Sequence, residues 1–178
     1  VLLVRHGQAS FGTADYDVLS DRGHRQAEVT AAALAAAGYR PTLVVSGSLR
    51  RQRDTALPFG EPEIDPRWDE YDAEDVIAHH GASVARLVST GGGDEPMDTK
   101  AFQRALDPAL DGWIAAGEGS PSRQSWTAFS GAAVAALAEV SARLGPGQTA
   151  VVATSGGVIA ALASDLLGAG TTAFVALN

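Results

Sequence analysis

The sequence VVATSGGVIAAL, residues 151–162, contains the turn that decides the fold. An apolar run ends at Thr154-Ser155-Gly156-Gly157, and a second apolar run follows at once. The pattern predicts a buried strand that leads through a tight turn into a buried helix. The first turn of a helix offers unpaired N–H groups and the positive end of the helix dipole, both of which suit an anion. The stretch is therefore either a phosphate site of its own or one wall of a larger site.

The rest of the chain alternates in the same way between short apolar runs and helical patterns. Strands are predicted at residues 1–4, 42–46, 63–65, 149–153 and 173–177, and helices at residues 21–37, 49–57, 73–80, 99–116, 123–144 and from 156 onward. This order indicates an α/β fold, a three-layer α/β/α sandwich with a mostly parallel central sheet. Because ligands of such sheets bind beyond the carboxyl ends of the strands, we expect the segments that follow residues 4, 46 and 153 to meet.

Composition limits the classes of function. The 178 residues are expected to form a single domain over residues 1–178, with residues 81–98 as a surface loop. A net charge of −8 argues against a nucleic-acid or anionic-membrane surface, and no apolar run is long enough to span a membrane. The absence of cysteine excludes disulfides and is compatible with a cytoplasmic protein. Both ends fall at apolar runs, so we expect the chain to be trimmed at both termini; a homodimer is among the states that the sequence allows.

Arg5-His6-Gly7 follows the first predicted strand directly. The arginine offers a rigid fork of N–H donors for phosphate oxygens. Histidine can accept and return a group near neutral pH, as a nucleophile or as an acid and base. Gly7 allows a tight turn and the close approach of a ligand. The alternative is a strand end whose polar residues have no function, and the tripeptide alone does not separate the two interpretations.

Three arginines, Arg50, Arg51 and Arg53, begin the helix predicted at residues 49–57. Cations at this end oppose the helix dipole, and a bound anion would offset that cost. Successive side chains point in different directions around a helix, so the three cannot all face one site. We interpret Arg50 and Arg53 as solvated.

Taken together, these segments resemble the histidine phosphatase superfamily, also called the phosphoglycerate-mutase-like family. Arg5-His6-Gly7 resembles the motif that gives the family its name. LSDRGHRQA, residues 19–27, is similar to its Leu-Thr/Ser-x-x-Gly-x-x-Gln-Ala helix start, and SGSLRRQRDTA, residues 46–56, to its Ser-Ser-Pro-Leu-x-Arg-Ala-x-Gln-Thr-Ala segment. WDEYD, residues 68–72, falls where the family has Leu-x-Glu, and residues 151–162 resemble its strand-Ser/Thr-His-Gly-Gly-helix element.

The resemblance implies a phosphoglycerate-mutase-like fold and a phosphate site that needs no metal and no cofactor. His6 would accept the phosphoryl group, Arg5 and Arg51 would hold the phosphate, and Glu70 would give a proton to the leaving group. Ser155 and the backbone at Gly7 and Gly156 would complete the phosphate contacts. Asp72 is the alternative acid if the register differs by two residues.

Ser155 is the main departure from the resembled family, which has its second histidine at this place. A serine hydroxyl can donate one hydrogen bond to a phosphate oxygen, but it brings no positive charge. Loss of one preorganised donor elsewhere costs about 3–4 kcal/mol, or roughly 10²- to 10³-fold in rate. Ser155 is therefore both an expected ligand contact and a reason to expect reduced activity.

The remaining candidates have simpler interpretations. His24 is interpreted as a solvated helix residue, and the three tryptophans as packing residues. His79 and His80 point about 100° apart on a helix, and no set of His, Asp and Glu nearby completes a metal site. The residues expected to line the substrate, because they follow the nucleophile closely, are Gln8, Ser10 and Phe11.

Three functions are compatible with these residues. The first is a phosphomonoester hydrolase that acts on a small phosphorylated molecule or a phosphopeptide through a phosphohistidine. The second is a domain that binds a phosphorylated ligand with little turnover, which Ser155 favours. The third is a phosphoglycerate-type mutase, which needs a closed pocket; the sequence shows no evident lid, so it ranks last.

Overall fold

The computed structural model describes residues 1–10, 17–81 and 99–178, and of residues 99–103 it describes the backbone alone. The predictions for Phe11 and for a loop at residues 82–98 therefore lie outside the described residues. The strands are β1 (Leu2–Arg5), β2 (Pro41–Ser46), β3 (Glu63–Ile64) and β4 (Thr149–Thr154). The helices are α1 (Asp21–Ala36), α2 (Arg50–Ala56), α3 (Ala73–His80), α5 (Thr99–Ala116), α6 (Trp126–Ala142), α7 (Gly156–Leu166) and α8 (Gly170–Leu177), with 3₁₀ turns at Leu57–Phe59, Pro66–Trp68 and Gly117–Gly119.

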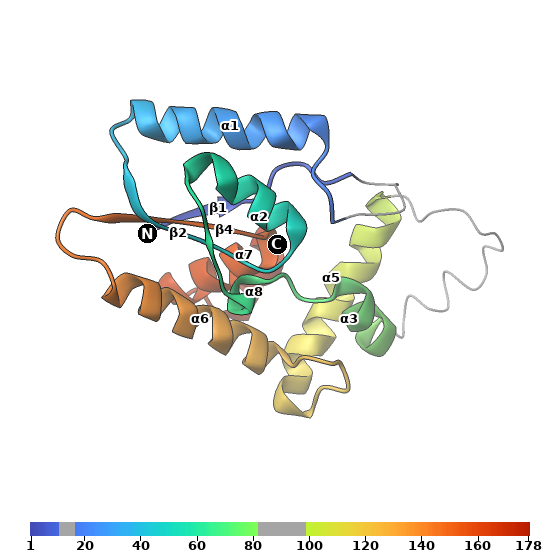
Figure 1. The fold of residues 1–178 in the computed structure, drawn as a ribbon. Helices are drawn as coiled ribbons and strands as arrows, with labels where there is room; N and C mark the ends of the chain where they lie inside the picture. The colour runs from blue at the N-terminus through green and yellow to red at the C-terminus, as the bar shows by residue number, and fades with distance from the viewer. Residues whose placement is uncertain (11–16, 82–98) are drawn as a thin grey trace.

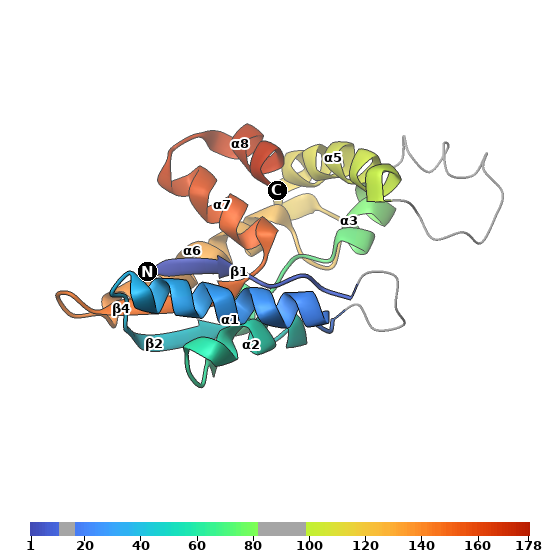
Figure 2. The same cartoon turned by 90° about the horizontal axis from the view of Figure 1, so that it is seen from above.

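The sheet confirms the predicted α/β fold. Within the described residues it has four strands in the order β1-β4-β2-β3, and every neighbouring pair is parallel. Helices α1 and α2 cover one face, and α6, α7 and α8 cover the other, which gives three layers (Figures 1 and 2). Helices α3 and α5 lie beyond the edge of the sheet at which the strands end (Figure 1). No helix in the described ranges is long and apolar enough to cross a membrane.

Strand β4 lies at the centre of this sheet. Five of its six residues, from Ala150 to Thr154, are buried, because both faces are covered by helices. Its pairing with β1 sets Arg5 opposite Thr154, and its pairing with β2 sets Ser46 opposite Ala153. The carboxyl ends of β1, β4 and β2 therefore lie side by side, as the sequence predicts.

The helix ends follow local signals. Ser20 caps α1 by accepting a hydrogen bond from the N–H of Gly23, and Gly38 follows its end with a φ of 89°. Helix α6 begins later than predicted. Ser125 is its cap and accepts from the N–H of Ala128, whereas the N–H of Arg123 donates to Asp75. The backbone before Ser125 is thus bound to the start of α3 and does not continue the helix.

The prediction of a last strand at residues 173–177 is wrong, because this segment belongs to helix α8. Five apolar residues in a row fit a buried strand and a buried helix equally well. In this helix Phe174 is fully buried, and Leu177, at the end of the helix, is exposed. Phe174 packs against Trp126, their ring centroids 4.4 Å apart, so tertiary packing decides the conformation.

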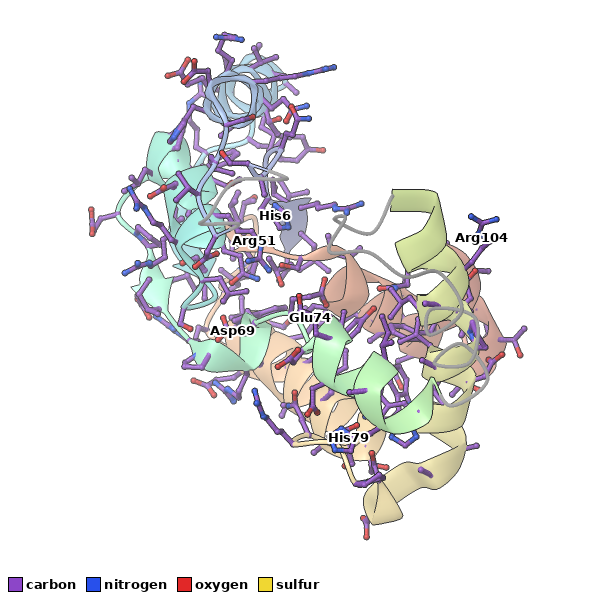
Figure 3. All side chains as sticks on the ribbon, turned by 90° about the vertical axis from the view of Figure 1, so that its right-hand side faces the viewer. His6, Arg51, Asp69, Glu74, His79 and Arg104 are labelled. Atoms are coloured by element: carbon purple, nitrogen blue, oxygen red, sulfur yellow. The ribbon has the colours of Figure 1, made fainter. Side chains whose placement is uncertain are left out.

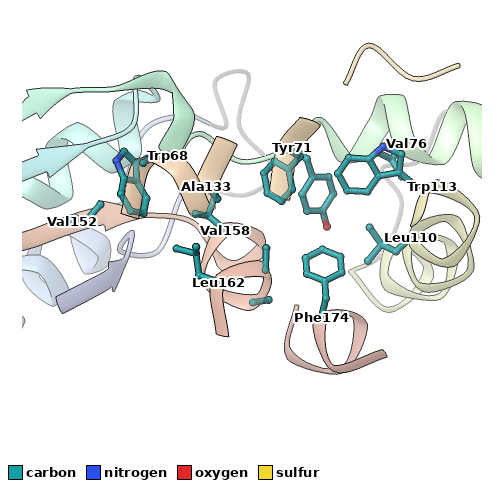
Figure 4. Packing of buried hydrophobic residues seen from close by; sticks show 14 of the residues in the cluster. Trp68, Tyr71, Val76, Leu110, Trp113, Ala133, Val152, Val158, Leu162 and Phe174 are labelled. Carbon is teal, nitrogen blue, oxygen red and sulfur yellow. The ribbon is translucent and has the colours of Figure 1, made fainter. Parts of the chain in front are cut away.

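The main core joins the sheet to the helices of one layer. Its aromatic part surrounds Tyr71, near Trp113 and Phe174 (Figure 4). The ring centroid of Tyr71 lies 5.2 Å from that of Trp113 and 5.5 Å from that of Phe129. Trp68 and Trp113 are fully buried, which confirms their interpretation as packing residues. The residues around Tyr71 anchor the segment that carries Glu70 close to the start of α7.

Candidate active site

His6 follows β1 directly and is held by its neighbours in one orientation. Its backbone N–H donates to the carbonyl of Thr154 at 2.8 Å, which extends the pairing of β1 with β4 by one residue. Its Nδ1 lies 2.8 Å from the carbonyl oxygen of Gly7. A carbonyl only accepts, so Nδ1 carries the proton and Nε2 presents its lone pair. Arg51 Nε donates to this Nε2 at 3.3 Å (Figure 3).

Burial lowers the pKa of His6 below its ordinary value of 6.5, and the guanidinium groups of Arg51 and Arg5 lower it further. The hydrogen bond to Gly7 and the carboxylate of Asp17 act in the opposite direction but do not reverse the shift. The imidazole is therefore neutral near pH 7. A neutral ring with a fixed, unprotonated Nε2 is the form of histidine that acts as a nucleophile.

Gly7 fits closely against the first turn of α1. A Cβ on Gly7 would lie 2.4 Å from the carbonyl oxygen of Gly23, and a Cβ on Gly23 would lie 2.2 Å from that of Gln8. The two glycines thus allow two backbone segments to touch. The N–H of Gly7 donates at 3.0 Å to Thr55 Oγ1, which itself donates at 2.7 Å to the carbonyl of Arg51. Thr55 therefore connects the backbone beside His6 to α2.

Of the three arginines of α2, only Arg51 lies in the site. It is 8% exposed, whereas Arg50 and Arg53 are exposed to solvent, as predicted. Asp17 Oδ1 accepts from Arg51 Nη1 at 2.8 Å, and Asp17 Oδ2 accepts from the backbone N–H of Arg50 at 2.8 Å. The carboxylate thus stands at the positive end of α2 and beside the arginine that neighbours His6.

Glu70 lies at the first turn of α7. Its Oε2 accepts from the N–H of Gly157 at 2.9 Å, and its Oε1 accepts from the N–H of Tyr71 at 3.3 Å. Burial raises the pKa of Glu70 above its ordinary value of 4.5, although these two hydrogen bonds and the charges of Arg51 and Arg5 lower it in part. A buried carboxyl with a raised pKa holds a proton at a higher pH than a solvated one and can act as an acid.

Arg5 approaches α7 from the end of β1. A Cβ on Gly156 would lie 3.4 Å from Arg5 Cζ, so the guanidinium passes over the first residue of the helix. Ser155, one residue earlier, is fully buried. Its Oγ accepts at 2.7 Å from Nε2 of Gln52, and its side chain makes no capping hydrogen bond to α7.

The elements thus bring together His6, Arg5, Arg51, Glu70 and the first turn of α7. The model of the histidine phosphatase superfamily (branch 1) matches residues 1–178. The chain belongs to the histidine phosphatase superfamily. No curated protein sequence matches it significantly.

Several solved structures resemble the chain along almost its whole length. A mycobacterial glucosyl-3-phosphoglycerate phosphatase, in complex with VO3, is 25% identical with a TM-score of 0.66, over 99% of this chain and 85% of that one. Mycobacterial hydrolase 1 is 26% identical with a TM-score of 0.65, over 99% and 82% of the two chains. A phosphoserine phosphatase mutant from Entamoeba histolytica, in complex with phosphoserine, is 16% identical with a TM-score of 0.63, over 99% and 83%, and shows the shared fold alone.

A cavity of about 270 Å³ adjoins the site of this superfamily member between β1 and α1. Arg5, His6 and Gly7 form one side, and Gln26 and Thr30 of α1 form part of the other. Gln8 is exposed, and its backbone N–H donates to Gln26 at 2.8 Å. Ser10 is half-buried and its N–H donates to the carbonyl of Val18 at 2.8 Å.

The other candidates lie away from the site. His24 is exposed on α1, as predicted. His79 pairs with Asp75, and His80 Nε2 lies 2.8 Å from Ser120 Oγ, at the far end of α3 from His6 (Figure 3). Among the residues that the structure describes, no group of three or more His, Cys, Asp or Glu could hold a metal. Asp72 caps α3 and pairs with Arg123, so it does not share the position of Glu70.

Sequence reasoning missed three residues that support the site: Asp17, Gln52 and Asp69. Asp69 accepts from both the N–H and the Oγ of Ser48, which ties the turn before α2 to the turn that carries Glu70. A helix start with three arginines and no acidic residue signals a need for an external carboxylate, but it does not identify Asp17. Gln52 could have been noticed as a departure from the resembled segment, which has alanine at this place.

Proposed function

We propose that this chain is a phosphomonoester hydrolase that acts through a phosphohistidine at His6. The observation that carries the proposal is the orientation of the imidazole: Nδ1–H donates to Gly7, and the Nε2 lone pair lies beside Arg51. Arg5 and Arg51 bring two positive charges to the same strand ends, and the N-terminus of α7 adds the positive end of a dipole. Phosphoryl transfer depends mainly on such positioning and charge.

In the first step the phosphate of the substrate lies between the two guanidinium groups. The Nε2 lone pair forms a bond to phosphorus, and the bond from phosphorus to the ester oxygen breaks in line with it. Glu70, protonated, transfers its proton to the departing oxygen, so that an alcohol leaves. The imidazole acquires positive charge, and the Nδ1–H bond to Gly7 stabilises it.

In the second step Glu70, now ionised, accepts a proton from a water molecule. The water oxygen forms a bond to phosphorus, the bond between phosphorus and Nε2 breaks, and its electron pair returns to the ring. Inorganic phosphate leaves, and His6 and Glu70 regain their first protonation states. No metal ion is required in this scheme because Arg5 and Arg51 supply the positive charge.

The substrate class that we propose is a small phosphorylated molecule or a phosphopeptide. Glucosyl-3-phosphoglycerate, the substrate named for one similar phosphatase, belongs to the first kind. Gln8 and Ser10 follow the nucleophile and are the described residues that we expect to influence the choice of substrate.

The second candidate function is binding of a phosphorylated ligand with slow turnover. The burial of Ser155 favours it, because a fully buried hydroxyl that already accepts from Gln52 is a weaker phosphate partner than an exposed cation. The two candidates differ in one observable, the formation and decay of phosphohistidine.

Hydrolysis of p-nitrophenyl phosphate between pH 4 and 8 tests the proposal. His6→Ala should abolish the activity, and His24→Ala, which changes an exposed histidine of α1, should not change it. Rapid quenching should trap a phosphorylated His6 that decays at the rate of turnover. Equal rates for wild type and His6→Ala would refute the hydrolase. Phosphate binding without phosphohistidine would support the second candidate.

A further inference from the structure

Gln52 directly follows Arg51 in α2 and has a buried side chain. Its amide nitrogen donates two hydrogen bonds. The side chain is 0% exposed. Its Nε2 donates at 3.0 Å to the carbonyl of Trp68 and at 2.7 Å to Ser155 Oγ. A carbonyl can only accept, so the amide orientation is fixed: the nitrogen faces Trp68, and Ser155 is an acceptor toward Gln52.

The first of these hydrogen bonds holds the turn that carries Glu70. The carbonyl of Trp68 lies two residues before Glu70 and also accepts from Thr154 Oγ1 at 2.6 Å. Both lone pairs of this oxygen are therefore used, one by α2 and one by the end of β4. The turn is fixed against the two elements that supply Arg51 and the start of α7.

The second hydrogen bond determines what Ser155 can do. A serine before a helix usually accepts from an N–H of the first turn. Ser155 makes no such bond, and its Oγ receives Gln52 instead. The N–H of Gly157 is bound by Glu70. Ser155 thus faces Gln52 and does not cap α7, and the N–H of Gly157 in the first turn is bound by Glu70 instead.

The two ends of this hydrogen bond are also two places at which the sequence departs from the resembled family. The segment that SGSLRRQRDTA resembles has alanine where this chain has Gln52, and the element that residues 151–162 resemble has histidine where this chain has Ser155. Gln52 is larger than the alanine of the resembled family, and Ser155, which it contacts, is smaller than the family's histidine. The buried amide lies where a larger side chain at residue 155 would need room.

We infer that Gln52 is a positioning residue for the proposed phosphoryl transfer, acting through Ser155 and through the turn that carries Glu70. The inference rests on the proposed function. Stability alone does not account for this residue, because Gln52 Oε1 is buried and has no hydrogen-bond partner among the described residues. One of the two polar atoms of the side chain is therefore unsatisfied among the described residues.

The experiment uses Gln52→Met, which keeps the length of the side chain and removes its donors, with Gln124→Met, at an exposed position, as the matched control. For Gln52→Met we expect kcat on p-nitrophenyl phosphate to fall about 10- to 100-fold with a KM close to that of wild type, because Glu70 and α7 are no longer held in register. The basic limb of the pH profile, which reports Glu70, should shift. Gln52→Leu, an apolar side chain of similar volume that also lacks the donor, should show the same loss if Gln52→Met does not fold.

The pairing with Ser155 is tested by combination. Ser155→Ala added to Gln52→Met should cause less further loss than Ser155→Ala alone, because the two residues act as one unit. Ser155→His alone should lower the activity, since the imidazole meets Gln52, and Gln52→Ala with Ser155→His should exceed Ser155→His alone. Wild-type kcat and an unchanged pH profile in Gln52→Met, or strictly additive losses, would overturn the inference.

Orthovanadate binding separates this inference from the proposed function. If wild type binds orthovanadate but forms no phosphohistidine, the hydrolase proposal fails while Gln52 is still tested, because Gln52→Met should then weaken orthovanadate binding and Gln124→Met should not. If Gln52→Met binds orthovanadate as wild type does in that case, the role of Gln52 is refuted. If wild type binds no orthovanadate, both the hydrolase proposal and the role of Gln52 are refuted.

Discussion

Gly157 and Glu70 are matched in shape as well as by a hydrogen bond. The N–H of Gly157 donates to Glu70 Oε2 at 2.9 Å, and a Cβ on Gly157 would lie 2.3 Å from Glu70 Oε1 and 2.5 Å from Tyr71 Cε1. The carboxyl therefore rests against bare backbone at the first turn of α7. Any side chain at this position would displace the group that we propose as the acid.

Gly157→Ala is expected to lose most of the activity and to destabilise the fold by about 1–3 kcal/mol, because the added methyl overlaps Glu70 and the buried ring of Tyr71. The matched control is Gly131→Ala, at an exposed position inside α6 where a Cβ meets nothing within 4 Å. It should stabilise the protein by about 0.5–1 kcal/mol. Urea unfolding and kcat together check both. An active, stable Gly157→Ala protein would show that Glu70 does not depend on this contact.

The pH profile of kcat/KM should be bell-shaped. Activity requires neutral His6, whose pKa lies below 6.5, so the acid limb falls below that pH. It also requires protonated Glu70, whose pKa lies above 4.5, so the basic limb falls above that pH. Glu70→Gln should remove the basic limb and lower the rate roughly 10²- to 10⁴-fold with a poor leaving group. An acid limb with its midpoint above pH 6.5 would contradict the assignment of His6.

Asp17→Asn should tighten binding of a phosphate dianion by up to about fivefold. The change removes a negative charge next to Arg51 but keeps an acceptor for the N–H groups of α2, and a partly exposed charge pair contributes up to about 1 kcal/mol. Asp17→Ala also removes the acceptor and should lower stability by about 1 kcal/mol. Asp54→Asn, which changes the partner of Arg50, is the control. KM and inorganic phosphate inhibition measure the effect, and weaker binding in Asp17→Asn would show that Asp17 serves mainly to orient Arg51.

Phe174→Ala should destabilise the fold by about 3–5 kcal/mol, whereas Leu177→Ala should cost less than about 0.5 kcal/mol. The first side chain of α8 is fully buried, and the second is exposed. Val175→Ala, which changes a half-buried residue of α8, should have an intermediate cost. Urea unfolding gives the free energy for each variant. A small cost for Phe174→Ala would mean that α8 does not contribute to the core.

Much of this arrangement follows from local patterns in the sequence. Arg5, His6 and Arg51 directly follow or begin elements whose apolar patterns are clear, and parallel pairing brings such ends to one edge of a sheet. Ser20 and Gly38 mark the ends of α1 because capping depends on a few neighbouring residues. These features need no knowledge of distant contacts.

The features that the sequence did not predict depend on distant contacts. Gln52 and Ser155 are 103 residues apart in the chain, and nothing near either of them indicates that they meet. Asp17 reaches Arg51 over 34 residues and takes its role from how the two segments pack. Residues 173–177 fit a strand or a helix until Phe174 meets Trp126. In each case tertiary packing selects among locally equivalent choices.

The central place of β4 has a consequence for how the protein is made. β1 and β2 do not pair with each other, and β4, which begins 108 positions after β2 (149 − 41), lies between them and joins them. A ribosome has therefore synthesised His6 and Arg51 long before any strand exists that can set them side by side. We expect a fragment ending before residue 149 to lack the site, since the pairing that forms it spans most of the chain and closes late. Under the proposed function, phosphate binding would therefore begin only after β4 has been synthesised.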